Sequence, residues 1–132
     1  MKRTNVAIIG AGTWGEIHAM AYSSTEAANL VCICDLDEMR AKTMAEKYHC
    51  NYTTKSSEIA NDSEIEVVSV ATPDFAHFAP VMEMLEANKN IIVEKPLATS
   101  LKEAEEMTKK AKEKHEQEKK FRGLTTKETS MI

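Results

Sequence analysis

Three of the chain's four glycines fall within six positions, in the stretch AIIGAGTWGEIH near the amino terminus. In a turn from a strand into a helix, Gly10 would permit a tight bend and Gly12 would let the backbone come close to a pyrophosphate. Gly15 would let the new helix pack against the strand. The unpaired N–H groups of Thr13 and Trp14 would then face the phosphates at the positive end of the helix dipole. The spacing predicts a dinucleotide-binding turn.

An acidic residue follows at the distance that such a turn requires. Asp35 ends the next apolar run, twenty positions after Gly15, where a carboxylate accepts the hydroxyls of an adenosine ribose. That carboxylate would repel a 2′-phosphate, so the sequence favours NAD, while Arg40 keeps NADP possible. Two alternatives remain open at this point. The glycines could be ordinary turn residues with Asp35 capping a helix, or the same features could belong to a methyltransferase that holds S-adenosylmethionine.

The elements that would position these residues follow from the apolar runs. Short runs bounded by glycine, proline or polar residues predict buried strands at 5–10, 29–35, 51–54, 66–73 and 90–96. Helical spacing predicts helices beginning near Thr13 and Ser100 and lying over 36–49, 56–61 and 74–88. Strands that alternate with helices through short loops imply a parallel sheet with right-handed crossovers. We therefore expect a doubly wound α/β fold of the Rossmann type.

Several helix ends carry recognisable signals. Asp37 is placed to cap the second helix, and Ser100 with Glu103 forms a capping box. His49 and Asn88 stand where a helix often ends with glycine, and we expect both to take the left-handed conformation. The residues of the last helix expected on its buried face are Leu101, Ala104, Met107 and Ala111.

Composition narrows the class of protein. The chain has 132 residues, of which 42% are hydrophobic, enough for one core. The net charge of −4 offers no basic face for a nucleic acid, and no apolar run is long enough for a membrane span or a signal peptide. The odd number of cysteines, three, indicates structural thiols in a reducing compartment. We expect a cytoplasmic protein with no nucleic-acid or membrane partner and no metal site.

One further motif points to a family. The segment VEKPLATS at 93–100, preceded by ATPDFAHFAPVMEMLEANKNI, resembles the amino-terminal half of the glucose–fructose oxidoreductase and inositol dehydrogenase family, Gfo/Idh/MocA. The resemblance runs from about residue 4 to 115. It rests on the glycine turn with His18 and on Asp35, Ala71-Thr72-Pro73, His77 and Glu94-Lys95-Pro96.

The resemblance implies a nicotinamide-dependent oxidoreductase that acts on sugars, cyclitols or related alcohols. Lys95 would lie near the nicotinamide and the substrate hydroxyl, at the carboxyl end of the fifth strand, and would transfer the proton while hydride moves. The alternative for Lys95 is a solvated loop lysine. By the same resemblance Glu94 and Pro96 shape this loop, and Ala71, Thr72 and Pro73 line the path of the cofactor.

The sequence leaves the roles of three aromatic side chains open. His77 and His18 could each reach a cofactor hydroxyl, or His77 could cap its helix. Trp14 could cover the pyrophosphate or pack in a domain interface.

The expected domain arrangement is a dinucleotide-binding domain over 1–118 and a disordered or aberrant tail over 119–132. Family members carry a second, α+β domain that holds the substrate, and we expect none in this sequence, as in a truncation, a frameshift or a cloned fragment. Such a chain would bind nucleotide without turnover, and a polyol or sugar would bind if a second domain were supplied. The alternative is a standalone NAD-sensing or protein-interaction module that uses the exposed edge strand NIIVE, with a homo-oligomer formed through that edge.

Overall fold

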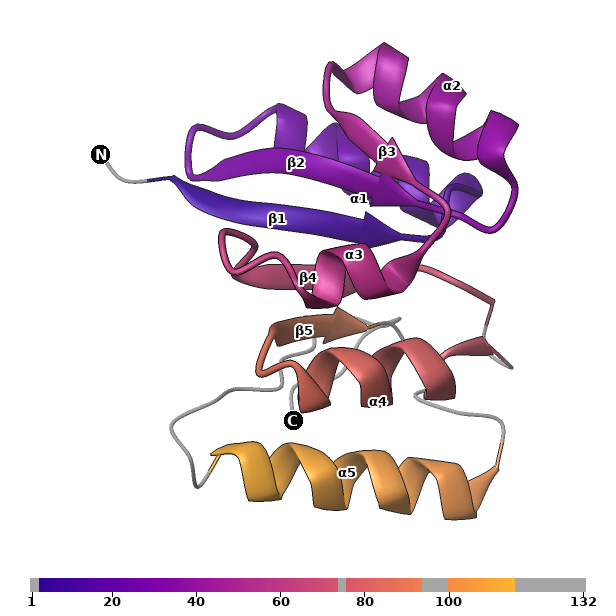
Figure 1. Cartoon of the computed structure of the whole chain (residues 1–132), viewed down its shortest axis with the longest axis vertical. Coiled ribbons are helices and arrows are strands. Elements are labelled where there is room, and N and C mark those ends of the chain that lie inside the picture. Colours follow the sequence, from indigo (N-terminus) through magenta and orange to yellow (C-terminus); the bar gives the residue numbers. More distant parts are fainter. Residues whose placement is uncertain (1–2, 74–75, 94–99, 116–132) are drawn as a thin grey trace.

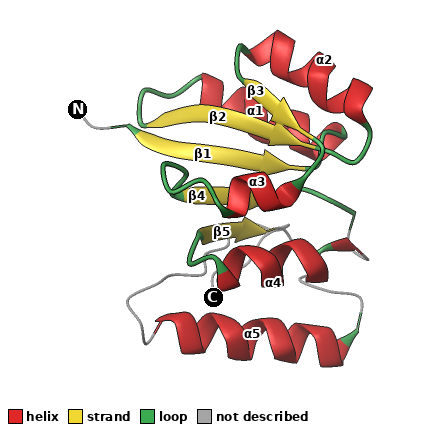
Figure 2. Cartoon of the chain, viewed as in Figure 1, coloured by secondary structure: helices red, strands yellow, loops and turns green. Residues whose placement is uncertain are grey.

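The computed structural model of the chain describes residues 3–73, 76–93 and 100–115, and strands alternate with helices along it (Figures 1 and 2). The strands are β1 (Thr4–Ile9), β2 (Ala28–Cys34), β3 (Asn51–Thr53), β4 (Val67–Val70) and β5 (Asn90–Val93). The helices are α1 (Thr13–Ser23), α2 (Glu38–Tyr48), α3 (Ser56–Ala60), α4 (Phe78–Glu86) and α5 (Leu101–His115). Each expected element is present, so the predicted order of elements is confirmed.

All strand pairs are parallel, and the strand order is β3-β2-β1-β4-β5. The chain moves outward from β1 in one direction and then crosses back to β4 and β5, so the order reverses between β1 and β4. Helices α1 and α2 cover one face, α3 and α4 cover the other, and α5 packs against α4 (Figure 1). This confirms the doubly wound Rossmann-type fold. Ligands in such folds bind at the carboxyl ends of the strands, where the order reverses.

Side chains of the central strands alternate between two apolar clusters. Ile8 and Ile33 pack with Ala19 of α1 and Met44 of α2. The larger cluster, on the opposite face, joins strand residues such as Val68 and Ile91 to buried side chains of α3, α4 and α5. Because both faces are covered, the strands are near-continuous apolar runs, as parallel strands usually are.

Several polar residues stand at helix ends because they cap the helix or tolerate the left-handed conformation there. The Asp37 carboxylate accepts the N–H of Arg40 at 3.2 Å and caps α2. His49 and Asn88 have φ of 58° and 64°, so the predicted left-handed conformations are confirmed. Their polar side chains tolerate a conformation that most residues avoid.

At the start of α5, the Ser100 hydroxyl accepts the N–H of Glu103 at 3.0 Å, as predicted. The predicted apolar face holds for Met107 and Ala111, which are buried, but it is wrong for Leu101, which is 76% exposed. At about 100° per residue, Leu101 lies about 120° around the helix axis from Met107. The first residue of α5 therefore turns away from α4.

Lys89 is a buried cation that joins two connections of the fold. Its side chain is 5% exposed, and Nζ donates to the carbonyls of Asp62 at 2.5 Å and Ile65 at 2.8 Å. Burial lowers the pKa of Lys89, while the Asp62 carboxylate acts in the opposite direction. The ammonium thereby ties the turn after α4 to the segment between α3 and β4.

Lys89→Met is expected to lower the free energy of unfolding by about 2–3 kcal/mol, because two carbonyls lose a charged donor. Urea denaturation followed by circular dichroism measures this change. The matched control is Lys112→Met, which removes an exposed lysine of α5 and should change stability by less than about 0.5 kcal/mol. Equal stability of the two variants would contradict the role assigned to Lys89.

All three cysteines are free thiols. Burial raises the pKa of Cys32 to about 12 and that of Cys34 and Cys50 to about 11. Since the thiolate is the nucleophile, the rise from 9.0 to about 11 lowers the reactive fraction about 100-fold near pH 8. We expect slow reaction of the folded chain with a disulfide reagent such as DTNB, and rapid reaction of all three thiols in denaturant. A rapid, stoichiometric reaction of the folded chain would contradict this expectation.

Candidate functional site

The turn between β1 and α1 brings three segments of the chain together. Gly10 has a φ of 113°, and its N–H donates to the carbonyl of Cys34, at the end of β2, at 2.8 Å. A Cβ at Gly10 would lie 2.7 Å from the carbonyl of Ala71, at the end of β4. The left-handed conformation and the close backbone contact both require glycine at this position.

The other two glycines face different surroundings. A Cβ on Gly15 would lie 1.9 Å from the carbonyl oxygen of Gly10, so α1 packs directly on the turn. The nearest described atom to a Cβ on Gly12 is Nη2 of Arg40, at 3.0 Å, which belongs to a flexible side chain. The fold itself therefore requires glycine at 10 and 15. At Gly12 the neighbour of a Cβ would be a movable side chain rather than backbone.

Asp35 links the end of β2 to this turn. Its Oδ2 accepts the N–H of Ala11 at 2.7 Å, and its Oδ1 accepts the N–H of Asp37 at 2.8 Å. Nη2 of Arg40 lies 3.5 Å from Oδ2, and the Asp35 side chain is 12% exposed. The residue that caps α2 is Asp37, so capping that helix is not the task of Asp35.

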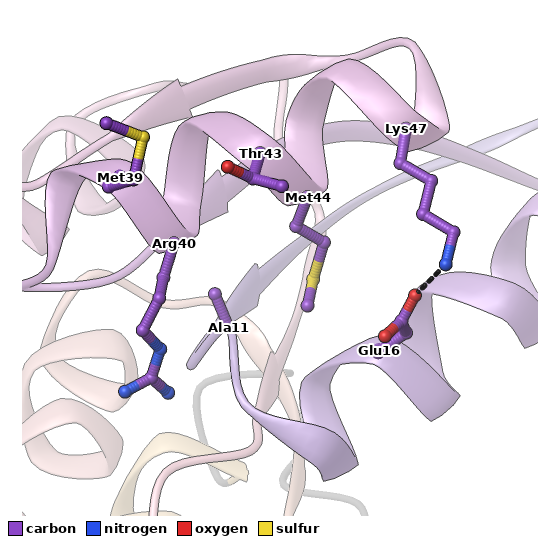
Figure 3. Close-up of a pocket in the computed structure, with 7 residues that line it drawn as sticks. All are labelled: Ala11, Glu16, Met39, Arg40, Thr43, Met44 and Lys47. Atoms are coloured by element: carbon purple, nitrogen blue, oxygen red, sulfur yellow. Dashed lines mark hydrogen bonds and ion pairs between the residues drawn. The ribbon is translucent and has the colours of Figure 1, made fainter.

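A hollow of about 300 Å³ opens beside the turn, between α1 and α2 (Figure 3). Its apolar floor and charged rim are formed by Ala11, Glu16, Met39, Arg40, Thr43, Met44 and Lys47. In Figure 3 the Arg40 side chain extends from α2 toward the segment that carries Ala11. Two of the lining residues, Ala11 and Arg40, also contact the Asp35 carboxylate.

An acidic residue stands in the first turn of α1, near the glycine turn. Glu16 accepts hydrogen bonds from Nζ of Lys47 at 2.5 Å and from the hydroxyl of Tyr48 at 2.9 Å. These bonds, that from Lys47 foremost, lower the pKa of Glu16. Sequence reasoning missed this pair, because Glu16 and Lys47 are 31 positions apart and their approach depends on how α1 lies against α2. Pairing with a cation offsets the repulsion that Glu16 would exert on an anion at the turn.

The end of β4 forms the other side of the crevice. The N–H of Ala71 donates to the carbonyl of Ile9 at 2.8 Å, and the hydroxyl of Thr72 donates to the carbonyl of Ala76 at 3.0 Å. His77 is 2% exposed and its Nε2 donates to the carbonyl of Thr72 at 2.9 Å. His77 stands at the N-cap of α4, as one alternative expected, but its side chain makes no capping hydrogen bond there. His77 instead holds the loop that begins with Thr72 and the exposed Pro73.

The aromatic residues of α1 divide between surface and interior. Trp14 is 50% exposed beside the glycine turn. His18 is buried and meets the ring of Tyr22 edge-on, at 6.3 Å between centroids. The Tyr22 hydroxyl is hydrogen-bonded to Ser69 of β4, so this side of α1 is fixed against the sheet.

Glu94, Lys95 and Pro96 lie outside the described residues. The strand that precedes them, β5, ends at Val93, which pairs with Val70 of β4. Within 3–73, 76–93 and 100–115, no group of three or more His, Cys, Asp or Glu is placed to hold a metal ion. The helices of this described part are each too short or too polar to cross a bilayer.

The chain is similar to known proteins in its family model, its sequence and its fold. The model of the oxidoreductase family with an NAD-binding Rossmann fold, GFO_IDH_MocA, matches residues 4–118. The chain is 32% identical over 113 residues to 2,7-anhydro-N-acetylneuraminate hydratase of Mediterraneibacter gnavus, covering 86% of this chain and 30% of that protein. It is 37% identical over 103 residues to inositol 2-dehydrogenase 2 of Paenarthrobacter aurescens, covering 77% of this chain and 31% of that protein.

Among solved structures, the chain is similar to myo-inositol dehydrogenase from Lactobacillus casei in complex with NAD(H) and myo-inositol. The TM-score is 0.81 at 28% identity, and the match covers 85% of this chain and 34% of the other. The chain thus spans about 30% of the length of the curated relatives it matches.

Proposed function

The chain belongs to the GFO_IDH_MocA family of oxidoreductases with an NAD-binding Rossmann fold, and from this premise we propose that residues 1–118 form a domain that binds a nicotinamide dinucleotide. The site lies across the carboxyl ends of β1, β2 and β4. The observation that carries the proposal is the construction of the glycine turn. Gly10 and Gly15 are required by backbone contacts within the fold, whereas a Cβ on Gly12 would meet the flexible side chain of Arg40, at 3.0 Å, so this position can be opened by a side-chain movement.

The groups around the turn fit a dinucleotide. Gly12 is the N-cap of α1 and has no side chain that could cap the helix, which leaves the N–H groups of Thr13 and Trp14 to the pyrophosphate. Each oxygen of Asp35 accepts one backbone N–H and retains acceptor capacity for a ribose hydroxyl. The carboxylate favours NAD at this position.

Residues beyond the turn would position the other half of the cofactor. We assign Ala71, Thr72 and Pro73 to the path toward the nicotinamide, with His77 acting through its bond to Thr72. Lys95 is proposed to hold and transfer the proton of a substrate hydroxyl, with Glu94 and Pro96 shaping its loop. When bound, the nicotinamide ring would supply hydride transfer.

For the longer proteins of this kind, we propose hydride exchange with a hydroxyl of a sugar, cyclitol or related alcohol. Support comes from the inositol dehydrogenases among the relatives. The 132-residue chain alone should bind the nucleotide and fail to turn over. It covers about a third of those proteins, and without a pocket that orients the alcohol, the large rate factor from positioning is lost. Membership in the family removes the methyltransferase alternative.

The test combines binding with turnover. NADH fluorescence is titrated with the chain, and NADH formation is followed with NAD⁺ and myo-inositol or glucose. Saturable binding without turnover is the expected result. Failure of a well-folded chain to bind NADH would contradict the cofactor site, whereas robust NADH formation would contradict the inactivity of the chain alone.

A second candidate function rests on the sheet edge. In the described sheet, β5 pairs with β4 on one side and forms the edge on the other. An unpaired strand edge can bind a strand of another chain. The alternative is therefore a standalone NAD-sensing or protein-interaction module that binds its partner, or a second copy of itself, through this edge. Analytical ultracentrifugation over a wide concentration range tests self-association. A monomer at the highest concentration would contradict pairing through β5 of two copies.

A further inference from the structure

We infer that Lys47, in the last turn of α2, is a positioning residue for the proposed cofactor site, because it holds the Glu16 carboxylate on the α2 side of α1 and cancels its charge. This inference rests on the proposed dinucleotide site and deepens it. Nζ of Lys47 donates to Oε2 of Glu16 at 2.5 Å, and the hydroxyl of Tyr48 donates to the same oxygen at 2.9 Å. Two side chains of a neighbouring helix therefore fix one oxygen of this carboxylate.

Glu16 stands where a negative charge acts on the proposed pyrophosphate site. Its N–H donates to the carbonyl of Gly12, the N-cap of α1, at 3.0 Å. Four residues span about 6 Å along a helix axis, and helical side chains lean toward the amino end. The bonds from Lys47 and Tyr48 lower the pKa of Glu16, so the carboxylate is charged at neutral pH. Without a cation beside it, this carboxylate would repel a pyrophosphate and compete with it for the free N–H groups at the helix start.

The pair lies at the rim of the hollow between α1 and α2, where Figure 3 shows Lys47 extending from α2 to meet Glu16. The Lys47 side chain is 63% exposed and that of Glu16 is 36% exposed. An ion pair this exposed adds little to stability, because water and salt screen it. Glu16 is, however, the only acidic residue of α1. The pair therefore matters through the charge that it cancels near the glycine turn.

The experiment measures the affinity of the full chain for NADH by calorimetric titration in low and in high salt. Lys47→Met keeps much of the side chain and removes its charge, so it should weaken NADH binding about three- to tenfold in low salt. In about 1 M NaCl, where the Debye length is about 3 Å, the loss should shrink to less than about twofold. Glu16→Gln/Lys47→Met should bind NADH within about twofold of the wild type, because the charge that Lys47 cancels is gone. The control Lys42→Met makes the same change in net charge at an exposed lysine of α2 and should leave the affinity unchanged.

The outcomes separate the inference from the proposed function. If Lys47→Met binds NADH as tightly as the wild type in low salt, the inference fails while the cofactor site stands. If Glu16→Gln alone weakens binding as much as Lys47→Met does, the pair is only a structural tie between two helices, and the inference fails. If the double variant stays as weak as Lys47→Met, Lys47 contacts the cofactor itself, and the inference again fails. If the folded wild type does not bind NADH, both the site and the inference fail.

Discussion

Gly15→Ala is expected to lower the free energy of unfolding by about 3 kcal/mol or more. The added methyl group would lie 1.9 Å from the carbonyl oxygen of Gly10. Because the obstacle is backbone rather than a mobile side chain, α1 must move away from the turn. Thermal and urea denaturation measure the loss.

Gly12→Ala is the matched variant for this prediction. Its methyl group would meet the Arg40 side chain at 3.0 Å, and that side chain is free to shift, so stability should change by less than about 1 kcal/mol. The affinity for NADH should nevertheless fall about tenfold or more, because the close approach of the backbone to the pyrophosphate is lost. Similar destabilisation by both variants, or unchanged NADH binding by Gly12→Ala, would contradict the division of roles among the glycines.

Asp35→Ala is expected to weaken NADH binding about ten- to a hundredfold. The ribose hydroxyls would lose a charged acceptor, and hydrogen bonds to charged groups contribute about 1.5–3 kcal/mol. The substitution also removes the acceptor for the N–H groups of Ala11 and Asp37. Affinity is therefore measured by calorimetry at a temperature where circular dichroism shows the variant to be folded.

Two comparisons make the result for Asp35 specific. Asp35→Asn keeps an acceptor oxygen and loses the charge, so its affinity for NADH should lie between those of the wild type and Asp35→Ala. NADPH binding should not weaken in parallel, because removal of the carboxylate also removes repulsion of the 2′-phosphate. Equal NADH affinity of the folded wild type and Asp35→Ala would refute the ribose-binding role.

The fold was predictable because its signals are local. Each strand is a short apolar run covered on both faces, and the left-handed ends at His49 and Asn88 follow from residue type. Leu101 was assigned wrongly to the buried face of α5, since it lies about 120° around the helix axis from the buried Met107 and is exposed. Its position around the helix axis was contained in the spacing, and the error came from its apolar residue type.

The glycines of the candidate site and the position of Asp35 could be predicted from the sequence. The hydrogen bonds that connect the surrounding side chains could not. The bond from His77 to Thr72 depends on the path of the loop after β4. The bond between Lys47 and Glu16 depends on the packing of two helices. Both are tertiary contacts between residues whose types allow many partners. The family, in contrast, was already indicated by motifs in order, and the match over residues 4–118 confirms it.

We propose that the glycine turn of this chain binds a nicotinamide dinucleotide. The most direct test is a titration of the isotope-labelled chain with NADH, followed by the backbone amide signals in two-dimensional NMR spectra. We expect saturable shifts that centre on Gly12, Thr13 and Trp14 and extend to Asp35 and Ala71, with little change at Met107 in α5. A well-dispersed spectrum in which NADH leaves the turn unchanged, or shifts residues of the β5 edge instead, would contradict it.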